Sequence, residues 1–338
     1  MAETTIYDIM KATIRYGGDR HYGEFGIEIE TESLKKYEYP ELKYWHCTKD
    51  NSLRNYGVEY VMRAPMDQKE LVHALAEFKV CAQKYKFLPN EVSTSVHVHL
   101  NFLNDTYKTV ANFLTLYAMF ENLLVTYSGP DRLSNLFCLP MRDAEGVFHN
   151  LMNMLNHISR KNWKGVPMGI DGVKYGGINP APFTRIGTLE VRTFRGETDT
   201  DIISKWVDIL MSLKKYARKD ITPIDILNSY KTHGNRFLDL VFEKNADELR
   251  CKDYESLIKQ NLFYAASFAT VCKDWSKFGI FKVKKVYKEK YLDKLEALSI
   301  DRFRMPYSEL DWAQRVIVYE MFTRNNPEMR IVEQEEDI

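Results

Sequence analysis

The sequence lacks the features that would assign it to several large classes of protein. It carries no net charge, with 47 basic and 47 acidic side chains among 338 residues, so no overall field attracts nucleic acid or anionic lipid. It has no run of about 18 apolar residues that could span a bilayer, and its first residues form no apolar signal-peptide core. We therefore expect a cytoplasmic protein with no membrane partner, and we do not expect nucleic acid as a partner.

Two further absences narrow the chemistry. The five cysteines are far apart, odd in number and never spaced as C-x-x-C, which argues against a disulfide framework and a zinc knuckle and favours a reducing compartment. Neither the G-x-x-x-x-G-K-[ST] phosphate loop nor the G-x-G-x-x-G dinucleotide fingerprint occurs. A nucleotide would therefore have to bind through metal ions and arginines rather than through a glycine-rich loop.

The chain does contain three pairs of polar residues at positions i and i+2 within strand-like apolar sequence. The pairs are Glu28 and Glu30, His97 and His99, and Glu190 and Arg192. Because side chains alternate across a strand, each pair shares one face while its apolar neighbours point the other way. Burying such groups unpaired costs several kcal/mol each. A cluster of divalent cations is the partner that suits all three pairs.

Each pair also has a simpler interpretation when it is taken alone. Two glutamates commonly lie on a solvated strand face, and two histidines can form a satisfied structural pair. Glu190 and Arg192 can form an ordinary salt bridge within a strand. Asp50 and Glu59, in KDNSLRNYGVEY, fit either a hairpin with its turn or two further carboxylate ligands.

Hydrophobic periodicity predicts an α+β domain followed by a helical region. The segment up to residue 103 alternates as strands do, apart from helical spacing over 67–85. Further helices are expected at 107–127, 144–159 and 201–217, and a strand at 187–194. Beyond residue 219 the composition becomes helical. We therefore expect one domain over 1–219 and a helical C-terminal extension over 220–338.

Five motifs in this order resemble the amidoligase family. They are FGIEIE, DNSL followed by GVEY, HVHLNF, PDRLSNLFCLP, and YGGINPAPFTRIGTLEVRTFRG. This family belongs to the superfamily of carboxylate–amine ligases that includes glutamine synthetase and glutamate–cysteine ligase. The resemblance covers residues 25–206. It implies a glutamine synthetase-like catalytic domain with a curved, mainly antiparallel sheet and helices on its outer face.

The resemblance also implies a division of the motif residues between two metal sites. Glu28, His97 and Glu190 would hold the metal that binds the phosphates of the nucleotide. Glu30 and Glu59 would hold the second metal, near the acceptor substrate.

Other residues would contact the substrates directly. His99 would face the nucleotide, and Arg192 would neutralise the transferred phosphate. Asp50 is the candidate to take the proton of the amine. Asn179 would contact the nucleotide or substrate, or else stabilise its turn. The further arginine candidates for the phosphates are Arg132, Arg185 and Arg195.

The implied activity is an ATP-dependent ligase that requires Mg²⁺, or alternatively Mn²⁺, and joins a carboxylate to an amine through an acyl phosphate. Its substrates would be small molecules or peptides, and the resemblance leaves a homo-oligomer open. Two alternatives remain. A metal-dependent hydrolase or nuclease would also use clustered glutamates and histidines. A non-catalytic binding or structural protein on the same fold is the other.

Overall fold

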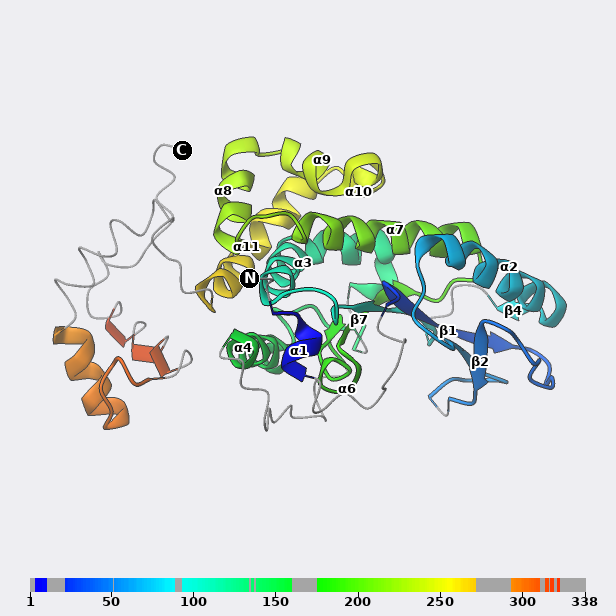
Figure 1. Cartoon of the computed structure of the whole chain (residues 1–338), viewed down its shortest axis with the longest axis horizontal. Helices are drawn as coiled ribbons and strands as arrows, with labels where there is room; N and C mark the ends of the chain where they lie inside the picture. Colours follow the sequence, from blue (N-terminus) through cyan, green and yellow to red (C-terminus); the bar gives the residue numbers. More distant parts are fainter. Residues whose placement is uncertain are drawn as a thin grey trace. The chain divides into compact units, whose positions relative to one another are not determined.

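The structure is a computed structural model that divides into two compact units, residues 1–273 and 274–338. It describes residues 4–10, 22–50, 52–88, 93–133, 135–136, 138–159, 175–271, 293–310, 314–315, 317–318 and 321–322. The first unit contains a sheet and most of the described helices (Figure 1).

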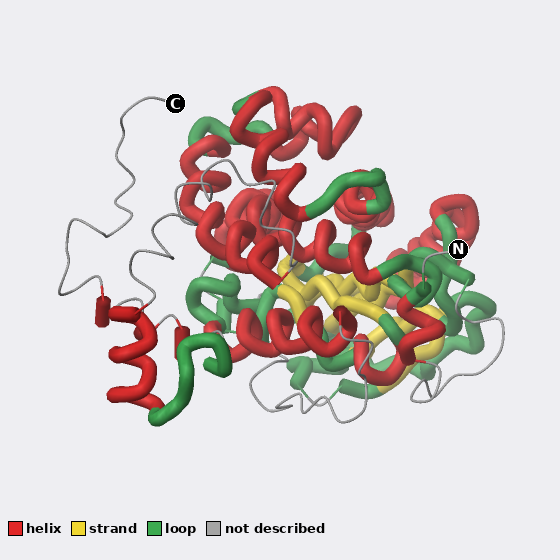
Figure 2. Tube along the Cα trace, turned by 60° about the vertical axis from the view of Figure 1, so that its left-hand side comes forward, coloured by secondary structure: helices red, strands yellow, loops and turns green. Residues whose placement is uncertain are grey.

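The first unit is built on a single sheet whose strands all pair antiparallel within the described residues. The strand order is β2-β3-β1-β5-β7-β6, with β4 paired to β1. The strands are β1 (Phe25–Ser33), β2 (Trp45–Thr48), β3 (Val58–Met62), β4 (Phe87–Leu88), β5 (Ser95–Asn101), β6 (Ile178–Asn179) and β7 (Thr188–Arg195). The strands form one layer, with most of the helices on one side of it (Figure 2). This is the mixed, mainly antiparallel α+β architecture that the sequence predicts.

Helices account for the rest of the first unit. They are α1 (Ile6–Met10), α2 (Gln68–Tyr85), α3 (Tyr107–Ser128), α4 (Glu145–Ser159), α6 (Phe183–Ile186), α7 (Thr200–Ala217), α8 (Pro223–His233), α9 (Arg236–Phe242), α10 (Ala246–Leu249) and α11 (Tyr254–Val271), with the short 3-10 helices η2 (Pro130–Arg132) and η3 (Glu243–Asn245). The four helices expected before residue 219 are confirmed as α2, α3, α4 and α7, each within one residue of its predicted bounds. The expected loop after α4 lies partly outside the described residues, because residues 160–174 are not described.

One face of the sheet is apolar and packs against helices. Phe194 of β7 stacks on Trp206 of α7, with ring centroids 4.8 Å apart. Tyr60 of β3 meets Phe78 of α2 edge to face at 5.3 Å. Ile27 and Val98, on the strands between them, are also fully or almost fully buried. Because side chains alternate, the polar members of the same strands point to the opposite face, which we call the site face.

Helix α3 is the centre of the helical layer and is buried on almost every side. It contacts the sheet through β7, and it also packs against α7, α8 and α11. Asn112 of α3 donates Nδ2 to the carbonyls of Ala217 and Ile221, at 3.0 and 2.9 Å, which fastens the end of α7. The boundary expected near residue 219 therefore falls inside the first compact unit.

The second unit is helical over 293–303. A small apolar core forms there from Leu295, Leu310, Val318 and Phe322. Among the described parts of both units, no helix is long and apolar enough to cross a membrane.

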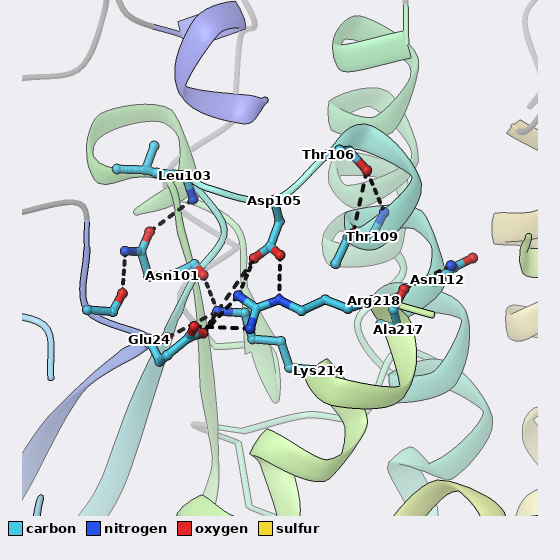
Figure 3. A network of polar contacts seen from close by, with 11 residues as sticks. Glu24, Asn101, Leu103, Asp105, Thr106, Thr109, Asn112, Lys214, Ala217 and Arg218 are labelled. Atoms are coloured by element: carbon cyan, nitrogen blue, oxygen red, sulfur yellow. Dashed lines mark hydrogen bonds and ion pairs between the residues drawn. The ribbon is translucent and has the colours of Figure 1, made fainter. Parts of the chain in front are cut away.

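A buried ion-pair network joins the sheet to α7 (Figure 3). Lys214 is fully buried, and its Nζ donates to Glu24 Oε2 at 2.6 Å and to the carbonyl of Asn101. Asp105 Oδ2 lies 3.5 Å from the same nitrogen, and Arg218 Nε donates to Asp105 Oδ1 at 2.6 Å. Burial lowers the pKa of Lys214, although Asp105 and Glu24 oppose that change. The network ties the start of β1, the end of β5 and the chain before α3 to one helix.

Removing the buried ammonium should destabilise the protein strongly. We expect Lys214→Ala to lower the free energy of unfolding by about 3–5 kcal/mol, because the buried carboxylate of Asp105 and the partly buried carboxylate of Glu24 lose a cationic partner. The matched control is Lys215→Ala, which removes the next lysine along the chain, 67% exposed and paired with Glu243. That exposed pair should contribute less than about 1 kcal/mol. Urea unfolding of both variants measures the difference, and equal losses would contradict the role of the network.

Candidate active site

The register of the central strands brings the three predicted pairs together. Glu28 of β1 lies directly opposite His97 of β5. His99, two residues further along β5, lies opposite Glu190 of β7. Residues that face each other across a ladder share one side of the sheet, so these side chains all point to the site face.

The first group consists of Glu28, His97 and Glu190. Nδ1 of His97 lies 3.3 Å from Glu28 Oε2 and 3.3 Å from Glu190 Oε1. One ligand atom from each residue lies within 4.8 Å of the other two, which is close enough to surround one cation. His97 and Glu190 are buried, and Glu28 is partly exposed. We call these residues the first carboxylate group.

A second group lies toward β3 and consists of Glu30, Glu59 and again His97. Glu30 and Glu59 are opposite each other in the β1–β3 ladder. Nε2 of His97 lies 3.9 Å from Glu30 Oε1, and Thr48 Oγ1 donates to Glu59 Oε2 at 3.2 Å. We call this set the second carboxylate group. One imidazole therefore faces both groups, through different nitrogen atoms.

Ser95 is a site residue that the sequence analysis missed. Its Oγ lies 2.6 Å from His97 Nε2 and donates to Glu30 Oε2, also at 2.6 Å. A proton on Nδ1 of His97 is donated in a hydrogen bond to Glu28. With a cation bound there, the proton would instead lie on Nε2 and be donated in a hydrogen bond to Ser95. The signal was present in the sequence, because Ser95 precedes His97 by two residues and so shares its face.

Strand β7 contributes Glu190 and Arg192. Nη1 of Arg192 contacts Glu190 Oε1, and Asn179 of β6 donates Nδ2 to Glu190 Oε2 at 2.7 Å. Both oxygens of Glu190 are thus held in place by donors. Asn179 Oδ1 also accepts from the amide of Ala181 at 2.9 Å, so Asn179 stabilises its own turn as well as Glu190.

A bulge in β7 changes which arginines share the site face. Between the pairs Val98 with Val191 and Val96 with Phe194, β7 has one more residue than β5. Ser95 is consequently opposite Arg195, which returns Arg195 to the site face. Simple alternation from Glu190 would place Arg195 on the other side.

The remaining arginine and aspartate candidates differ in how the structure places them. Arg132 is buried and donates to the backbone carbonyls of Thr193 and Arg192, at 3.0 and 2.8 Å, so it stabilises the β7 backbone at the bulge. Arg195 pairs with Glu197 at 3.1 Å. Asp50 lies in the β2–β3 loop, where Oδ1 accepts from the amide of Ser52 at 2.8 Å, and Arg185 is exposed on α6. Among the described residues, Asp50 is not a member of either carboxylate group.

Two histidines stabilise the charge of the first carboxylate group. Burial opposes ionisation of Glu28, but the positive charge of His99 and the hydrogen bond from His97 hold the pKa of Glu28 well below its usual range. Burial would likewise lower the pKa of His99, yet Glu28, 3.1 Å from Nε2, raises it to about 9. The pKa of Glu190 is also lowered, because His99, His97 and Arg192 outweigh its burial. At neutral pH this group is anionic and His99 is cationic.

The second carboxylate group lacks that compensation. Burial and the negative charge of Glu28 raise the pKa of Glu59 to about 7. A carboxylate that resists ionisation beside other carboxylates would be stabilised by a cation. The oxygen-rich donor set, with one imidazole, suits a hard divalent cation such as Mg²⁺ or Mn²⁺.

The raised pKa of Glu59 predicts a pH-dependent stability. Because the pKa of Glu59 in the folded state exceeds that of an unfolded glutamate, its contribution is full below about pH 4.5 and is lost as the pH rises through about 7. Glu59→Gln should therefore stabilise the metal-free protein at pH 8 relative to pH 5. We expect a difference of about 1–2 kcal/mol, which is less than full linkage because the carboxyl is partly exposed.

Unfolding measured in EDTA at both pH values tests this prediction. The control is Glu41→Gln, which changes an exposed glutamate outside the site. An equal effect of Glu59→Gln at pH 5 and pH 8 would show that Glu59 ionises without penalty.

Comparison with known proteins identifies the family of this chain. The family described as "Putative amidoligase enzyme" matches residues 21–214. No curated protein matches the chain significantly. The matched span is more than half of the chain and contains both carboxylate groups, Ser95, Asn179 and Arg192. This chain therefore belongs to the amidoligase family.

Proposed function

We propose that the protein is an ATP-dependent carboxylate–amine ligase that forms an amide bond through an acyl phosphate. Family membership supports amide-bond formation. The observation that carries the finer proposal is the arrangement of Glu28, His97 and Glu190 around a common space, with the guanidinium of Arg192 on Glu190. Such a site offers cation ligands and a phosphate-binding arginine side by side.

The residues present fit two divalent cations. The first would be held by Glu28, His97 and Glu190, and the second by Glu30 and Glu59. When bound, Mg²⁺ or Mn²⁺ would supply positive charge to the phosphate oxygens of the nucleotide. The carboxylates are already held by Ser95 and Asn179, so little reordering is needed to receive a cation.

The chemistry requires activation because a carboxylate has no acceptable leaving group. A carboxylate oxygen of the acid attacks the γ-phosphorus of ATP, the bond to the β-phosphate oxygen breaks, and ADP leaves. The amine then attacks the carbonyl carbon of the acyl phosphate, inorganic phosphate leaves with the bonding electrons, and the amine loses a proton. Each step moves negative charge onto phosphate oxygens. The site therefore needs fixed positive groups near them.

Two side chains at the β7 side of the site would supply that charge. Arg192 is partly exposed beyond Glu190, where its free donors can reach a transferred phosphate. His99 is cationic at neutral pH and adjoins Glu28, so it would contact the nucleotide. Arg132 acts behind them by holding the β7 backbone in place. Arg195 and Arg185 remain outer candidates for the phosphates.

The acid, which accepts the phosphoryl group, would bind at the opposite side of the site, toward β3. The second carboxylate group lies there, and the β2–β3 loop that carries Asp50 joins Thr48 to the strand of Glu59. Asp50 is our candidate to take the proton released by the amine. The antiparallel sheet, with helices on one face and the site on the other, fits a glutamine synthetase-like catalytic domain. We place the enzyme in the cytoplasm and expect small-molecule or peptide substrates.

The acyl phosphate gives a direct test of the reaction. With Mg²⁺, ATP and an active acid, hydroxylamine should replace the amine and give a hydroxamate, because a small strong nucleophile intercepts the activated carbonyl. ADP release should depend on the acid. A screen of carboxylate and amine pairs for ADP, followed by mass determination of the product, identifies the substrates. Glu190→Gln should abolish both signals while circular dichroism stays unchanged.

A different result would favour a hydrolase. Metal-dependent bond cleavage without a nucleotide requirement, with no hydroxamate from any acid that the protein acts on, would contradict the ligase. Full ADP release by Glu190→Gln would instead contradict the assignment of the first carboxylate group.

Arg192 should act on phosphoryl transfer rather than on cation binding. We expect Arg192→Ala to lower kcat by roughly 10² or more, because a donor aimed at developing charge is lost. Mn²⁺ affinity, measured by electron paramagnetic resonance, should change little. The control is Arg236→Ala, an exposed arginine on α9. A lost Mn²⁺ signal with Arg192→Ala would show that the arginine organises the cation ligands instead.

A further inference from the structure

Strand β1 makes a row of polar contacts on the site face with β5 and with the chain just before β5, and this row extends one step beyond the carboxylate groups. His97 meets Glu28, and Ser95 meets Glu30. The next step is Ser93, whose Oγ donates to Glu32 Oε1 at 2.8 Å. Glu32 follows Glu30 by two residues, so it shares the same face. It belongs to neither carboxylate group among the described residues.

Glu32 is only 2% exposed and is satisfied by donors from outside the sheet. The amide of Arg54 donates to Oε1 at 2.8 Å, and Asn55 Nδ2 donates to Oε2 at 2.9 Å. Both donors come from the loop between β2 and β3. A buried carboxylate with three hydrogen bonds of this length is a strong anchor, since each is made to a charged acceptor. The loop is therefore fastened to the site face of β1.

The loop itself has a compact, defined shape. Asn55 has a left-handed backbone, with φ of 51°, which directs its side chain toward Glu32. A Cβ on Gly57 would lie 2.2 Å from Leu53 Cβ, so this turn closes only with glycine. The amide of Tyr56 also donates to the carbonyl of Ser33, at 3.4 Å. With Glu32 in place, the described part of the loop has few ways to move.

The position of the loop connects it to the acceptor side of the site. The loop leaves β2 at Thr48 and enters β3 just before Glu59, and these two residues are paired by a hydrogen bond. It crosses the site face beside the second carboxylate group, whereas Arg192 lies two strands beyond β1 in the other direction. The loop thus borders the end of the site that lies away from the phosphate-binding arginine.

We propose that Glu32 is a positioning residue that holds the β2–β3 loop next to the binding site of the acid, which is the acceptor of the phosphoryl group. In this position the loop contacts and selects the acid substrate. This inference rests on the proposed function. Glu32 touches neither the nucleotide nor the reacting atoms. It acts by keeping residues 52–57 against β1, where they shape the space next to Glu30 and Glu59.

Three variants separate anchoring from general stability. Glu32→Ala removes all the acceptors. Glu32→Gln keeps Oε1 for Arg54 and Ser93, and its amide can donate to the Asn55 oxygen after the Asn55 side chain turns over. Asn55→Gly removes one donor without touching the buried strand, and it tolerates the positive φ. Glu41→Ala, at an exposed glutamate outside the loop, is the control.

Two measurements on the full chain test the proposal. The first measures how firmly the loop is held, by trypsin cleavage after Arg54 and by hydrogen exchange at the Arg54 amide. Both should accelerate at least tenfold in Glu32→Ala, because the hydrogen bonds to the Glu32 carboxylate are lost. They should accelerate less in Asn55→Gly and little in Glu32→Gln. The second is kinetic: Glu32→Ala should raise the KM for the acid roughly tenfold or more and leave the KM for ATP within about twofold.

The outcomes separate this inference from the proposed function. Unchanged cleavage and exchange in Glu32→Ala would overturn the anchoring by Glu32, whatever the enzyme does. Faster cleavage together with an altered KM for ATP, and an unaltered KM for the acid, would overturn the acceptor role of the loop. If the wild-type protein forms no hydroxamate, the proposed function fails and the acceptor role fails with it, while proteolysis still decides the anchoring.

Discussion

The mutual repulsion of four carboxylates around one buried imidazole is the constraint on which the rest of the site depends. Glu28, Glu30, Glu59 and Glu190 would separate if their backbones were free to move. They lie instead on adjacent strands whose opposite face is packed against α2, α3 and α7. Hydrophobic burial on one face therefore stabilises an unfavourable concentration of charge on the other. The network of Lys214 reinforces this by clamping the ends of β1 and β5 to α7.

The polar partners of these carboxylates divide the site into two electrostatic halves. Toward β7, His99 and His97 keep Glu28 and Glu190 ionised, while Asn179 and Arg192 hold Glu190 in place. Toward β3, the one hydrogen-bond partner of Glu59 among the described residues is the hydroxyl of Thr48, and the pKa of Glu59 is raised. The first half suits a phosphate-bearing substrate with its cation. The second half changes its charge near neutral pH and borders the loop that Glu32 holds. A reaction that joins a phosphorylated acid to an amine would use both halves.

Much of this site could be predicted from the sequence, because alternation along a strand is a strong constraint. The pairs Glu28 with Glu30 and His97 with His99 share a face by that rule alone, and the structure confirms it. Ser95 and Glu32 obeyed the same rule, but serine and a third glutamate have too many ordinary roles to stand out. Arg195 could not be placed, since a bulge shifts register without a mark in the composition. The packing of α8 and α11 on α3 is a tertiary contact that periodicity does not encode.

The position of His97 between the two sets of carboxylates has a consequence for the two cations that we propose. Nδ1 of His97 faces Glu28 and Nε2 faces Glu30, yet a neutral imidazole has only one nitrogen lone pair that can bind a cation. A cation bound to Nδ1 would leave only carboxylates for a second cation, because Nε2 would then carry the proton and donate it in a hydrogen bond to Ser95. The two proposed ions would therefore differ in affinity, and any effect of one on the binding of the other would be reciprocal. In the proposed two-cation site, the geometry of one ring would thus set the order of loading, with the more tightly held ion first and the exchangeable ion second.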